Sequence, residues 1–446
     1  MKELIAAHPK RVRMMVCALL FIAALTRYWI NYDPAISAPI GSETYRIAHS
    51  LYEHGQFANP FRATQTGPSA HLAPVFPSLL AGLMMIFGNQ SAGLYAIQLA
   101  AVLILSLQLS LYPLFSRLLG MGSLTGVIAA AAWILAKPEL IYGWEAFYAS
   151  LALVGACCLY RRQLDLQEPA ASTWVLGFLM GLLTLMLPSI LPVLCLWLAW
   201  EVWQRRAVFF KKFLLPLILL PALIVVPWTI RNYLVFHRFV LVRDDLGLEL
   251  AVSNNDCAQF STERNQSGCF QRNHPNANVQ EGKRIIELGE PEYNQERLRE
   301  ALDWMKTHPR QFVRLTAYRF IAWWMPTDIG KGSFAEYAGP GRLLERSIIY
   351  LMTLLSVAGL VILCRRDFKS AALCAPCLII FPILYYFVQY SDRYRDPVMW
   401  LTFLLGALPI SDFLQGLSHG ARGATLASGP GLTRSNSAWL AISRGS

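Results

Sequence analysis

Charge is scarce in this sequence of 446 residues. Only 15% of the residues are Asp, Glu, Lys or Arg, whereas 55% are hydrophobic. Ordinary soluble domains carry about 25% charged residues. The deficit excludes a chain built of two soluble domains. Together with 13 Trp and a series of long apolar runs, it is typical of an all-α polytopic membrane protein.

Motifs of soluble enzymes are also missing. The sequence has no glycine-rich phosphate loop ending in Lys, no H-E-x-x-H and no nucleophile elbow. Two of the nine cysteines, Cys257 and Cys269, lie outside the apolar runs. Only His274 lies near them, so their spacing does not predict zinc. In an oxidising compartment the two cysteines are candidates for a disulfide.

The net charge of +11 does not indicate nucleic-acid binding, because the basic residues are not gathered in a polar domain. They form short clusters beside apolar runs, which is typical of cytoplasmic loops under the positive-inside rule. The clusters are Lys10-Arg11-Arg13, Arg161-Arg162, Arg205-Arg206, Lys211-Lys212 and Arg365-Arg366.

About ten transmembrane helices are predicted. A poor cleavage site after Thr26 and the aromatic pair Tyr28-Trp29 favour a retained first helix over a cleaved signal peptide. With the N-terminus inside, these spans place every basic cluster and both termini on the cytoplasmic side of an inner membrane. The spans lie near 14–30, 92–116, 124–143, 147–160, 172–187, 188–200, 213–230, 343–364, 370–390 and 396–413.

Two polar regions fall on the opposite, periplasmic face. The first loop, 31–91, includes an apolar segment at 73–88 that is too short to span and predicts an interfacial helix. The second, 231–342, predicts a small subdomain with an amphipathic helix at 292–306, whose apolar residues are Leu298, Leu302 and Met305, and an interfacial helix at 311–325. The predicted division is 1–230 (core with first loop), 231–342 (subdomain), 343–413 (C-terminal spans) and 414–446 (disordered cytoplasmic tail).

Glu43 is the candidate catalytic residue. It follows the first span and begins a helical run near the membrane surface, where a carboxylate can take a proton from an attacking hydroxyl. The alternative is a solvated loop acid, which base rates favour. Asp33 is a second candidate, although Asp33-Pro34 is also typical of a turn.

Four arginines, Arg231, Arg243, Arg393 and Arg395, lie on the same predicted face and are candidates to clamp a phosphate. The alternative is that they snorkel or pair with neighbouring acids. His71 is a further candidate, although packing or hydrogen bonding is the more ordinary role for such a residue. Asn254 and Asn255 are candidate sugar-binding residues or parts of a turn.

The run "ETYRIAHSLYEHGQFANPF…TGPSAHLAPVFPSLLAGLMMIFG" resembles the first periplasmic loop of bacterial integral-membrane glycosyltransferases of the GT-C superfamily. These are relatives of the protein O-mannosyltransferases and of the lipid A aminoarabinose transferase. Residues 227–256, 289–324 and 392–407 extend the resemblance, which covers most of the chain up to about residue 413.

The resemblance implies inverting transfer of a sugar from a polyprenyl-phosphate donor to an acceptor at the outer membrane surface. The acceptor is a protein, a lipid or a glycan. The family often has paired acids in this loop, but here Gly41-Ser42 precede a single Glu43. One carboxylate is a thin ligand set for Mg²⁺ or Mn²⁺, so a tightly bound divalent metal is doubtful, and no cofactor is assigned with certainty. The positive charge of arginine is expected to replace the charge of a metal ion at the phosphate.

A transporter or flippase of a lipid-linked sugar is the alternative function. It would require ionisable residues at mid-membrane on broken helices, and often paired repeats. The sequence has almost no such charges and shows no internal duplication. A membrane scaffold would explain the composition but would leave the arginines without a role.

Overall fold

The computed structural model describes residues 9–30, 40–136, 144–206, 208–265, 268–325 and 340–427. Asp33 and the end of the predicted tail, 428–446, lie outside these residues. Within the described part the chain is helical, with only two isolated β-bridges and no strand. The prediction of an all-α fold is confirmed.

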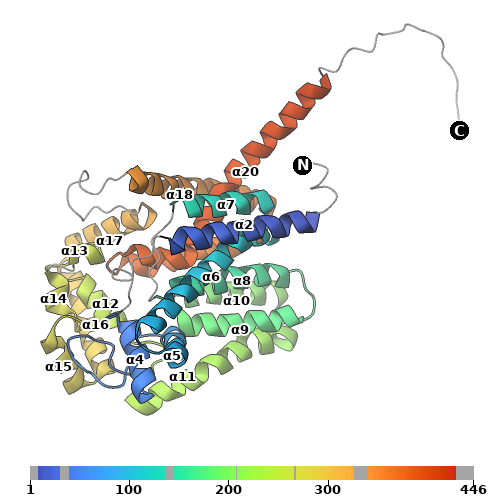
Figure 1. Cartoon of the computed structure of the whole chain (residues 1–446). Helices are drawn as coiled ribbons and strands as arrows, with labels where there is room; N and C mark the ends of the chain where they lie inside the picture. The colour runs from blue at the N-terminus through green and yellow to red at the C-terminus, as the bar shows by residue number, and fades with distance from the viewer. Residues whose placement is uncertain are drawn as a thin grey trace, which may run out of the picture.

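A bundle of roughly parallel and antiparallel helices forms most of the molecule (Figure 1). Its helices are α2 (Pro9–Trp29), α6 (Ser91–Leu118), α7 (Ser123–Ala136), α8 (Ala146–Gln163), α9 (Ala171–Met186), α10 (Leu191–Arg205), α11 (Leu220–Phe236), α18 (Pro340–Arg366), α19 (Phe368–Ile379) and α20 (Asp396–Ala427).

Six segments of the described chain are long and apolar enough to cross a membrane, by length and composition. They are Lys10–Trp29, Ser91–Leu118, Leu215–Phe236, Leu343–Arg366, Phe368–Tyr386 and Asp392–Leu417. Three further apolar helices, including α7 and α9, are shorter. The chain is therefore a polytopic membrane protein, while the predicted number of ten spans is not reached by these criteria.

Close helix contacts in the bundle depend on small residues. A Cβ on Gly359 of α18 would lie 1.9 Å from the carbonyl oxygen of Leu405 in α20, and one on Gly406 would lie 2.5 Å from the carbonyl oxygen of Met352. Such approach of two backbones is a common way to pack helices in membranes, where the hydrophobic effect does not drive association. Around these contacts the core buries Trp133, Trp197, Trp323 and Trp400.

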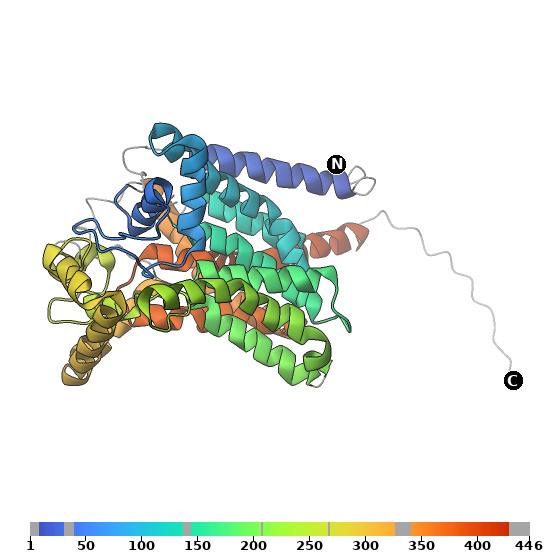
Figure 2. The ribbon, with the colours of Figure 1, turned by 90° about the horizontal axis from the view of Figure 1, so that it is seen from below.

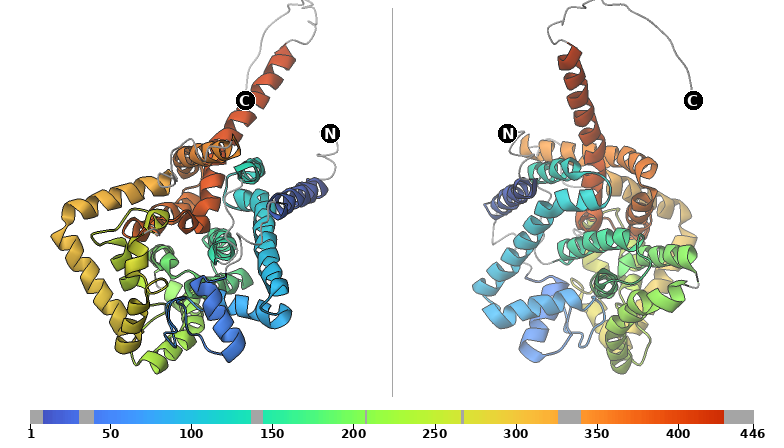
Figure 3. Two further views of the ribbon diagram at one scale, coloured as in Figure 1. Left: turned by 60° about the vertical axis from the view of Figure 1, so that its left-hand side comes forward. Right: turned by 90° about the vertical axis from the view of Figure 1, so that its right-hand side faces the viewer.

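Prolines and chain ends modify the predicted spans. Pro188 begins a 3₁₀ turn, η1 (Pro188–Ile190), that connects α9 to α10. After α19 the chain continues as the 3₁₀ segment η4 (Phe381–Tyr386) and not as a continuous helix to 390. Helix α20 runs to Ala427 and thus continues past residue 414, where the predicted tail begins. Figure 3 shows this end of α20 projecting from the bundle.

One end of the bundle carries the predicted first loop and subdomain, and we call it the loop end (Figure 2). It comprises α4 (Glu43–His54), α5 (Val75–Phe87), α12 (Leu246–Ser253), α13 (Thr262–Asn265), α14 (Cys269–Asn273), α15 (Val279–Leu288), α16 (Glu290–Thr307) and α17 (Pro309–Trp324). The three helices predicted at 73–88, 292–306 and 311–325 are α5, α16 and α17. In α16, Leu298 and Met305 pack against the cluster formed by Leu250, Ala251, Ala301 and Val388, whereas Leu302 is 42% exposed.

The opposite end gathers the basic clusters, and we call it the basic end. Arg161 Nε lies 3.0 Å from Asp367, and Lys369 Nζ lies 2.7 Å from Asp165, which joins the α8–α9 loop to the α18–α19 loop. The start of α2 and the end of α20 lie toward this end, away from α13–α16 (Figure 2). The clusters therefore share one end of the molecule, as the predicted topology requires.

Candidate functional site

Two cavities meet at the loop end. The first, of about 650 Å³, has charged residues at one side and apolar residues at the other, and we call it the amphipathic cavity. Its charged side is formed by Glu43, His71, Arg243, Asp245, Glu249 and Arg393, and its apolar side includes Leu187, Leu191, Ile380, Phe381, Ile383 and Leu384. Because Ile383 and Leu384 are also 42% and 38% exposed, the apolar side reaches the outer surface of the bundle.

The second cavity, of about 450 Å³, is more polar, and we call it the polar cavity. It extends toward α14 and the first loop, with Arg62, Thr262, Gln271, His274, Asn276 and Gln389 in its wall. Glu43, Trp144, Glu249, Arg393 and Tyr394 line both cavities. A group bound in either cavity can therefore reach the carboxylate of Glu43.

Helix α4 places Glu43 between the cavities. Ser42 is the N-cap, and its hydroxyl accepts a hydrogen bond from the backbone N–H of Tyr45 at 3.2 Å. Glu43 is the first helical residue, where the positive end of the helix dipole favours a carboxylate. Ile47 and Ala48 are buried. The amphipathic pattern of this segment thus anchors the helix and fixes the position of its first residue.

Two histidines flank the carboxylate of Glu43. His71 Nε2 lies 3.6 Å from Oε2, and His274 Nε2 lies 3.7 Å from Oε1; the side chains of His71 and His274 are 2% and 3% exposed. His274 Nδ1 accepts a hydrogen bond from the backbone N–H of Asn276. The neutral tautomer of His274 therefore carries its hydrogen on Nε2, facing Glu43.

Glu43, His71 and His274 differ in charge at neutral pH. Burial alone would raise the pKa of Glu43, but the interaction with His71, helped by His274 and Arg393, outweighs it and holds this pKa at about 2. Burial would lower the pKa of His71, but its interaction with Glu43 raises it to about 9. Burial lowers the pKa of His274 to about 4. At neutral pH the cluster is thus a carboxylate, an imidazolium and a neutral imidazole.

The loop that carries His71 is held by the subdomain. The backbone N–H of Ala70 donates to Glu290 Oε1 at 2.6 Å, and the backbone N–H of Asp244 donates to the carbonyl of Ala70 at 2.8 Å. The ring of Phe61 packs against that of His71, with centroids 4.9 Å apart. His71, for which packing was the more ordinary expectation, is placed directly at the candidate catalytic carboxylate.

Arg393 is the predicted arginine that faces the centre of the site. Its guanidinium lies over the ring of Trp144, 3.4 Å from the centroid, and Nη2 donates to the hydroxyl of Tyr394. Its Nε is buried without a hydrogen-bond partner, and within the described chain it has no carboxylate at ion-pair distance. Arg243 also lines the amphipathic cavity, where it forms an ion pair with Asp245.

Arg231 and Arg395 lie elsewhere. Arg231 donates to the carbonyls of Ser69 (2.8 Å) and Phe57 (3.0 Å), so it fastens the first loop to α11. Arg395 is 2% exposed, and its Nη2 donates to the hydroxyl of Thr353 in α18. Neither lines a cavity with Glu43. Their contacts explain packing, and they do not join Arg393 at the site.

The two candidate asparagines have structural contacts. Asn254 Nδ2 donates to the carbonyls of Leu250 and Phe387, both at 2.9 Å, and Oδ1 accepts from Arg319 Nη1 at 3.1 Å. Asn255 Nδ2 donates to the carbonyls of Ala251 and Val252. These contacts occupy the amide groups, and neither residue lines the two cavities.

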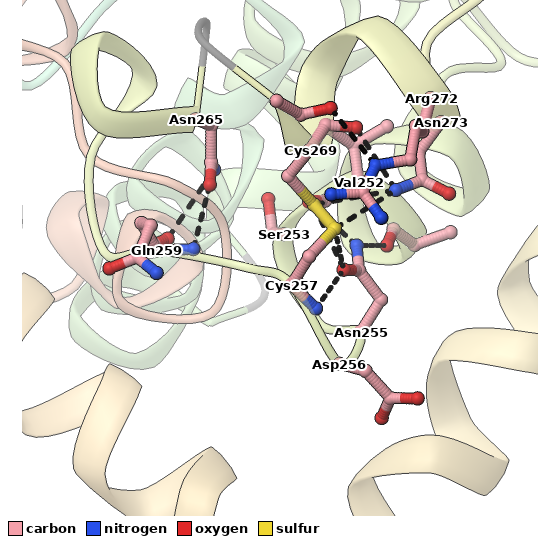
Figure 4. Close-up of a disulfide and its surroundings, with 12 residues drawn as sticks. Val252, Ser253, Asn255, Asp256, Cys257, Gln259, Asn265, Cys269, Arg272 and Asn273 are labelled. Atoms are coloured by element: carbon pink, nitrogen blue, oxygen red, sulfur yellow. Dashed lines mark hydrogen bonds between the residues drawn. A yellow bond between two sulfur atoms is a disulfide. The ribbon is translucent and has the colours of Figure 1, made fainter.

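The predicted disulfide between Cys257 and Cys269 is present, with a Cα–Cα distance of 5.5 Å (Figure 4). Asn255 Oδ1 accepts from the backbone N–H of Cys257 at 3.1 Å, and Asn273 Nδ2 donates to the carbonyl of Cys269 at 3.0 Å. Cys269 begins α14, and His274 directly follows that helix. The disulfide therefore holds the short helix that leads to His274.

Sequence reasoning missed two groups that the fold brings to the site. Glu249 of α12 lines both cavities, and burial, with the charges of Asp245 and Glu43, raises its pKa to about 7. His274 was considered only as a zinc ligand. Neither has a local sequence signal, because both are far from Glu43 in the chain and only the tertiary fold brings them together.

The donor set at Glu43 does not fit a divalent metal. Within the described residues, no group of three His, Cys, Asp or Glu side chains is arranged to hold a metal ion. The nearest side chain to Oε2 that could serve as a ligand is His71, which its raised pKa keeps protonated at neutral pH. A protonated imidazole has no lone pair for a metal.

No protein-family model matches the sequence, and no curated protein matches it either. Solved structures with a matching fold include two of an archaeal oligosaccharyltransferase. One is the archaeal oligosaccharyltransferase AglB from Archaeoglobus fulgidus in complex with an inhibitory peptide and a dolichol-phosphate, with a TM-score of 0.55 at 13% identity. The other is the apo form of the Archaeoglobus fulgidus oligosaccharyltransferase, with a TM-score of 0.52 at 14% identity.

Each likeness covers 96% of this chain and 53% of the archaeal chain, so the chain spans about half the length of these proteins. At this identity the likeness shows a shared fold. The chain is a multi-pass membrane protein that shares its fold with the matched half of an archaeal oligosaccharyltransferase.

Proposed function

We propose that the protein is an inverting glycosyltransferase that moves a sugar from a polyprenyl-phosphate donor to an acceptor on the periplasmic side of an inner membrane. The observation that carries this proposal is the position of Glu43 between an amphipathic cavity and a polar one. Such a pair of cavities fits a lipid-linked donor and a hydrophilic acceptor that meet at one carboxylate.

The donor occupies the amphipathic cavity. Its prenyl chain lies along the apolar side near Phe381 and Leu384, and its phosphate lies at Arg393. This half-buried guanidinium, whose Nε is buried and which has no carboxylate partner within the described chain, gains a counter-charge when the phosphate binds. Its planar fork stabilises the charge that develops as the sugar leaves. The archaeal neighbour holds a dolichol-phosphate, which supports a lipid-phosphate donor.

The acceptor occupies the polar cavity, and its hydroxyl attacks the anomeric carbon from the side opposite the phosphate. Glu43 accepts the hydrogen bond of that hydroxyl and orients it. With a pKa of about 2, Glu43 is a weak base until the hydroxyl becomes acidic in the transition state. Glu249, with a pKa of about 7, is a second carboxylate that the departing proton can reach.

The active face is periplasmic in this proposal. A disulfide at the loop end suits an oxidising compartment, and the basic clusters at the other end suit the cytoplasm. Both termini are then cytoplasmic. The peptide bound by the archaeal neighbour supports a peptide or protein as one class of acceptor, beside a lipid or a glycan.

The test is transfer by the purified protein in nanodiscs from radiolabelled polyprenyl-phosphate sugars. Wild type is expected to release polyprenyl phosphate and to label an acceptor fraction of the cell envelope, and Glu43→Gln is expected to do neither. Movement of intact sugar lipid across the bilayer without release of polyprenyl phosphate would favour a flippase instead.

A further inference from the structure

A third cavity, of about 600 Å³, lies against helix α4, and we call it the α4 pocket. Arg46, His49, Ser50 and Glu53 line it at the spacing i, i+3, i+4 and i+7, so they form one stripe along the helix. Arg62 of the first loop closes it. Neither Glu43 nor Arg393 lines this pocket.

The α4 pocket contains two cations without acidic partners. Within the described chain, neither Arg46 nor Arg62 has a carboxylate at ion-pair distance, and Arg46 Nε is buried without a hydrogen-bond partner. Burial lowers the pKa of Arg46, and the charge of Arg62 lowers it further, because the two guanidinium groups lie near each other. The hydroxyl of Ser50 is also buried and unpartnered, with the residue 6% exposed. Buried donors without partners are costly unless a ligand satisfies them.

The acid in the pocket does not neutralise these arginines. Glu53 Oε1 lies 3.2 Å from His49 Nε2, and Glu53 Oε2 lies 3.8 Å from His54 Nε2. Its carboxylate is therefore occupied by the two imidazoles at the far end of the stripe, and the positive charge of Arg46 and Arg62 remains uncompensated.

Arg62 connects the α4 pocket to the polar cavity, because it lines both. Its Cδ lies 3.9 Å from the position that a Cβ on Gly41 would take, two residues before Glu43. Its backbone N–H donates to Asn276 Oδ1 at 2.8 Å, and Asn276 also lines the polar cavity. A molecule in the polar cavity can thus extend past Arg62 into the α4 pocket.

We propose that the α4 pocket binds a phosphate group of the acceptor, held by Arg46, Arg62 and Ser50. Two guanidinium forks and a hydroxyl provide donors from several directions, which suits the oxygens of a phosphate. The assignment of this phosphate to the acceptor rests on the proposed function, whereas the anion site itself does not. The acceptor is then a phosphorylated glycan or glycolipid of the cell envelope.

The experiment measures binding of radiolabelled inorganic phosphate to the full-length protein in nanodiscs of neutral lipid, with saturating farnesyl phosphate to occupy the donor cavity. Wild type is expected to bind inorganic phosphate under these conditions. Arg46→Gln and Arg62→Gln are each expected to weaken binding by about 10-fold or more, since each removes charge-assisted hydrogen bonds. Arg299→Gln, at an exposed position of α16, is the matched control and is expected to leave binding unchanged.

Competition with glucose 6-phosphate and with dihexanoyl phosphatidic acid identifies the source of the phosphate. Stronger competition by the sugar phosphate supports a glycan, and stronger competition by the lipid supports a glycolipid head group. The proposal is overturned if farnesyl phosphate abolishes phosphate binding, or if the two substitutions leave it unchanged while circular dichroism shows folded protein. If phosphate binding depends on Arg46 but the protein transfers no sugar, the proposed function is wrong and the anion site is still supported.

Discussion

Arg393 at the loop end differs in its charge partners from two arginines at the basic end. At the basic end, Arg161 and Arg366 have carboxylate partners, with nitrogen–oxygen distances of 3.0 Å to Asp367 and 2.7 Å to Asp412. At the loop end, the guanidinium of half-buried Arg393 lies over the ring of Trp144, its Nε is buried, and it has no such partner within the described chain. A paired charge needs no ligand. An unpaired buried charge is costly, and a bound anion is the most direct way to offset that cost.

The comparison also separates residues that look alike in the sequence. Arg393 and Arg395 are two positions apart in "DRYRD", yet the first lines the amphipathic cavity and the second donates to Thr353 inside the bundle. The short 3₁₀ segment η5 (Asp392–Arg395) directs their side chains differently. Function at the loop end therefore depends on side-chain direction more than on the local density of charge.

The largest expected effect is that of Glu43→Gln. The amide keeps the size of the side chain but cannot take a proton, so transfer should fall by about 10³-fold or more. Initial rates with a polyprenyl-phosphate sugar in nanodiscs measure this effect. Glu287→Gln, at an exposed position of α15 that lines none of the three cavities, is the control and should keep transfer. A rate for Glu43→Gln near that of wild type would remove Glu43 from the mechanism.

Arg393→Gln should lower kcat by about 10²-fold, because it removes the guanidinium that stabilises the departing phosphate. Arg395→Gln is the neighbouring control. It should lower thermal stability through the lost bond to Thr353 while kcat stays within a few-fold of wild type. Equal losses of kcat for both variants would contradict the division between them that the structure makes.

The Glu43–His71 pair predicts a dependence of stability on pH. The pKa of Glu43 is lowered from 4.5 to about 2, so its contribution is present above pH 4.5 and is lost as pH falls toward 2. The pKa of His71 is raised from 6.5 to about 9, so its contribution is present below pH 6.5 and is lost as pH rises through 9. The loss above pH 6.5 should amount to at most about 3 kcal/mol.

Thermal unfolding in nanodiscs between pH 6 and pH 10 measures the contribution of His71 to stability. His71→Gln should be less stable than wild type at pH 6, and the difference between the two proteins should shrink as pH approaches 10. A constant difference over this range would mean that His71 is neutral in the folded protein.

Removal of the disulfide should have a moderate effect. Cys257→Ser with Cys269→Ser releases the segment that leads to His274, so stability should fall by about 2 kcal/mol. Transfer should fall several-fold through looser placement of His274 at Glu43. Thermal unfolding and transfer rates, with and without reductant, measure both effects. Wild type with reductant should resemble the double variant, and Cys195→Ser, at an exposed free cysteine, should not.

The smallest effect is expected at the basic end. Arg366→Gln breaks the ion pair with Asp412, in which the arginine side chain is 49% exposed. Exposed pairs contribute little, so stability should change by no more than about 0.5 kcal/mol, with transfer unchanged. A large loss of transfer in this variant would show that the two ends are coupled, contrary to the comparison drawn above.

Much of the fold was predictable because its signals are local. Apolar runs, the pattern of α4 and α16, and the prolines after α9 each determine structure over a few turns of helix. The errors arose where local signals compete with tertiary contacts. The segment after α19 pairs with Phe260 near Tyr390, and α20 continues past the predicted start of a disordered tail.

The candidate site was predictable only in part. Glu43 could be selected because local sequence patterns place it after a span and at the start of a helix. Glu249 and His274 could not, since they lie more than two hundred residues away and only the packing of α12 and α14 brings them near. The same packing gave Arg231 and Asn254 structural contacts that no local pattern indicates.

The sequence by itself determined that this chain is a helical membrane protein with its basic loops at one end and a single acid at the start of an amphipathic helix. Apolar composition and helical periodicity suffice for that, because they act over short stretches of chain. Only the tertiary structure decided which charges meet, since burial and the absence of a counter-charge depend on neighbours that are distant in the chain. The tertiary structure therefore gives Arg393 and Arg395 different surroundings and places two imidazoles beside the carboxylate of Glu43.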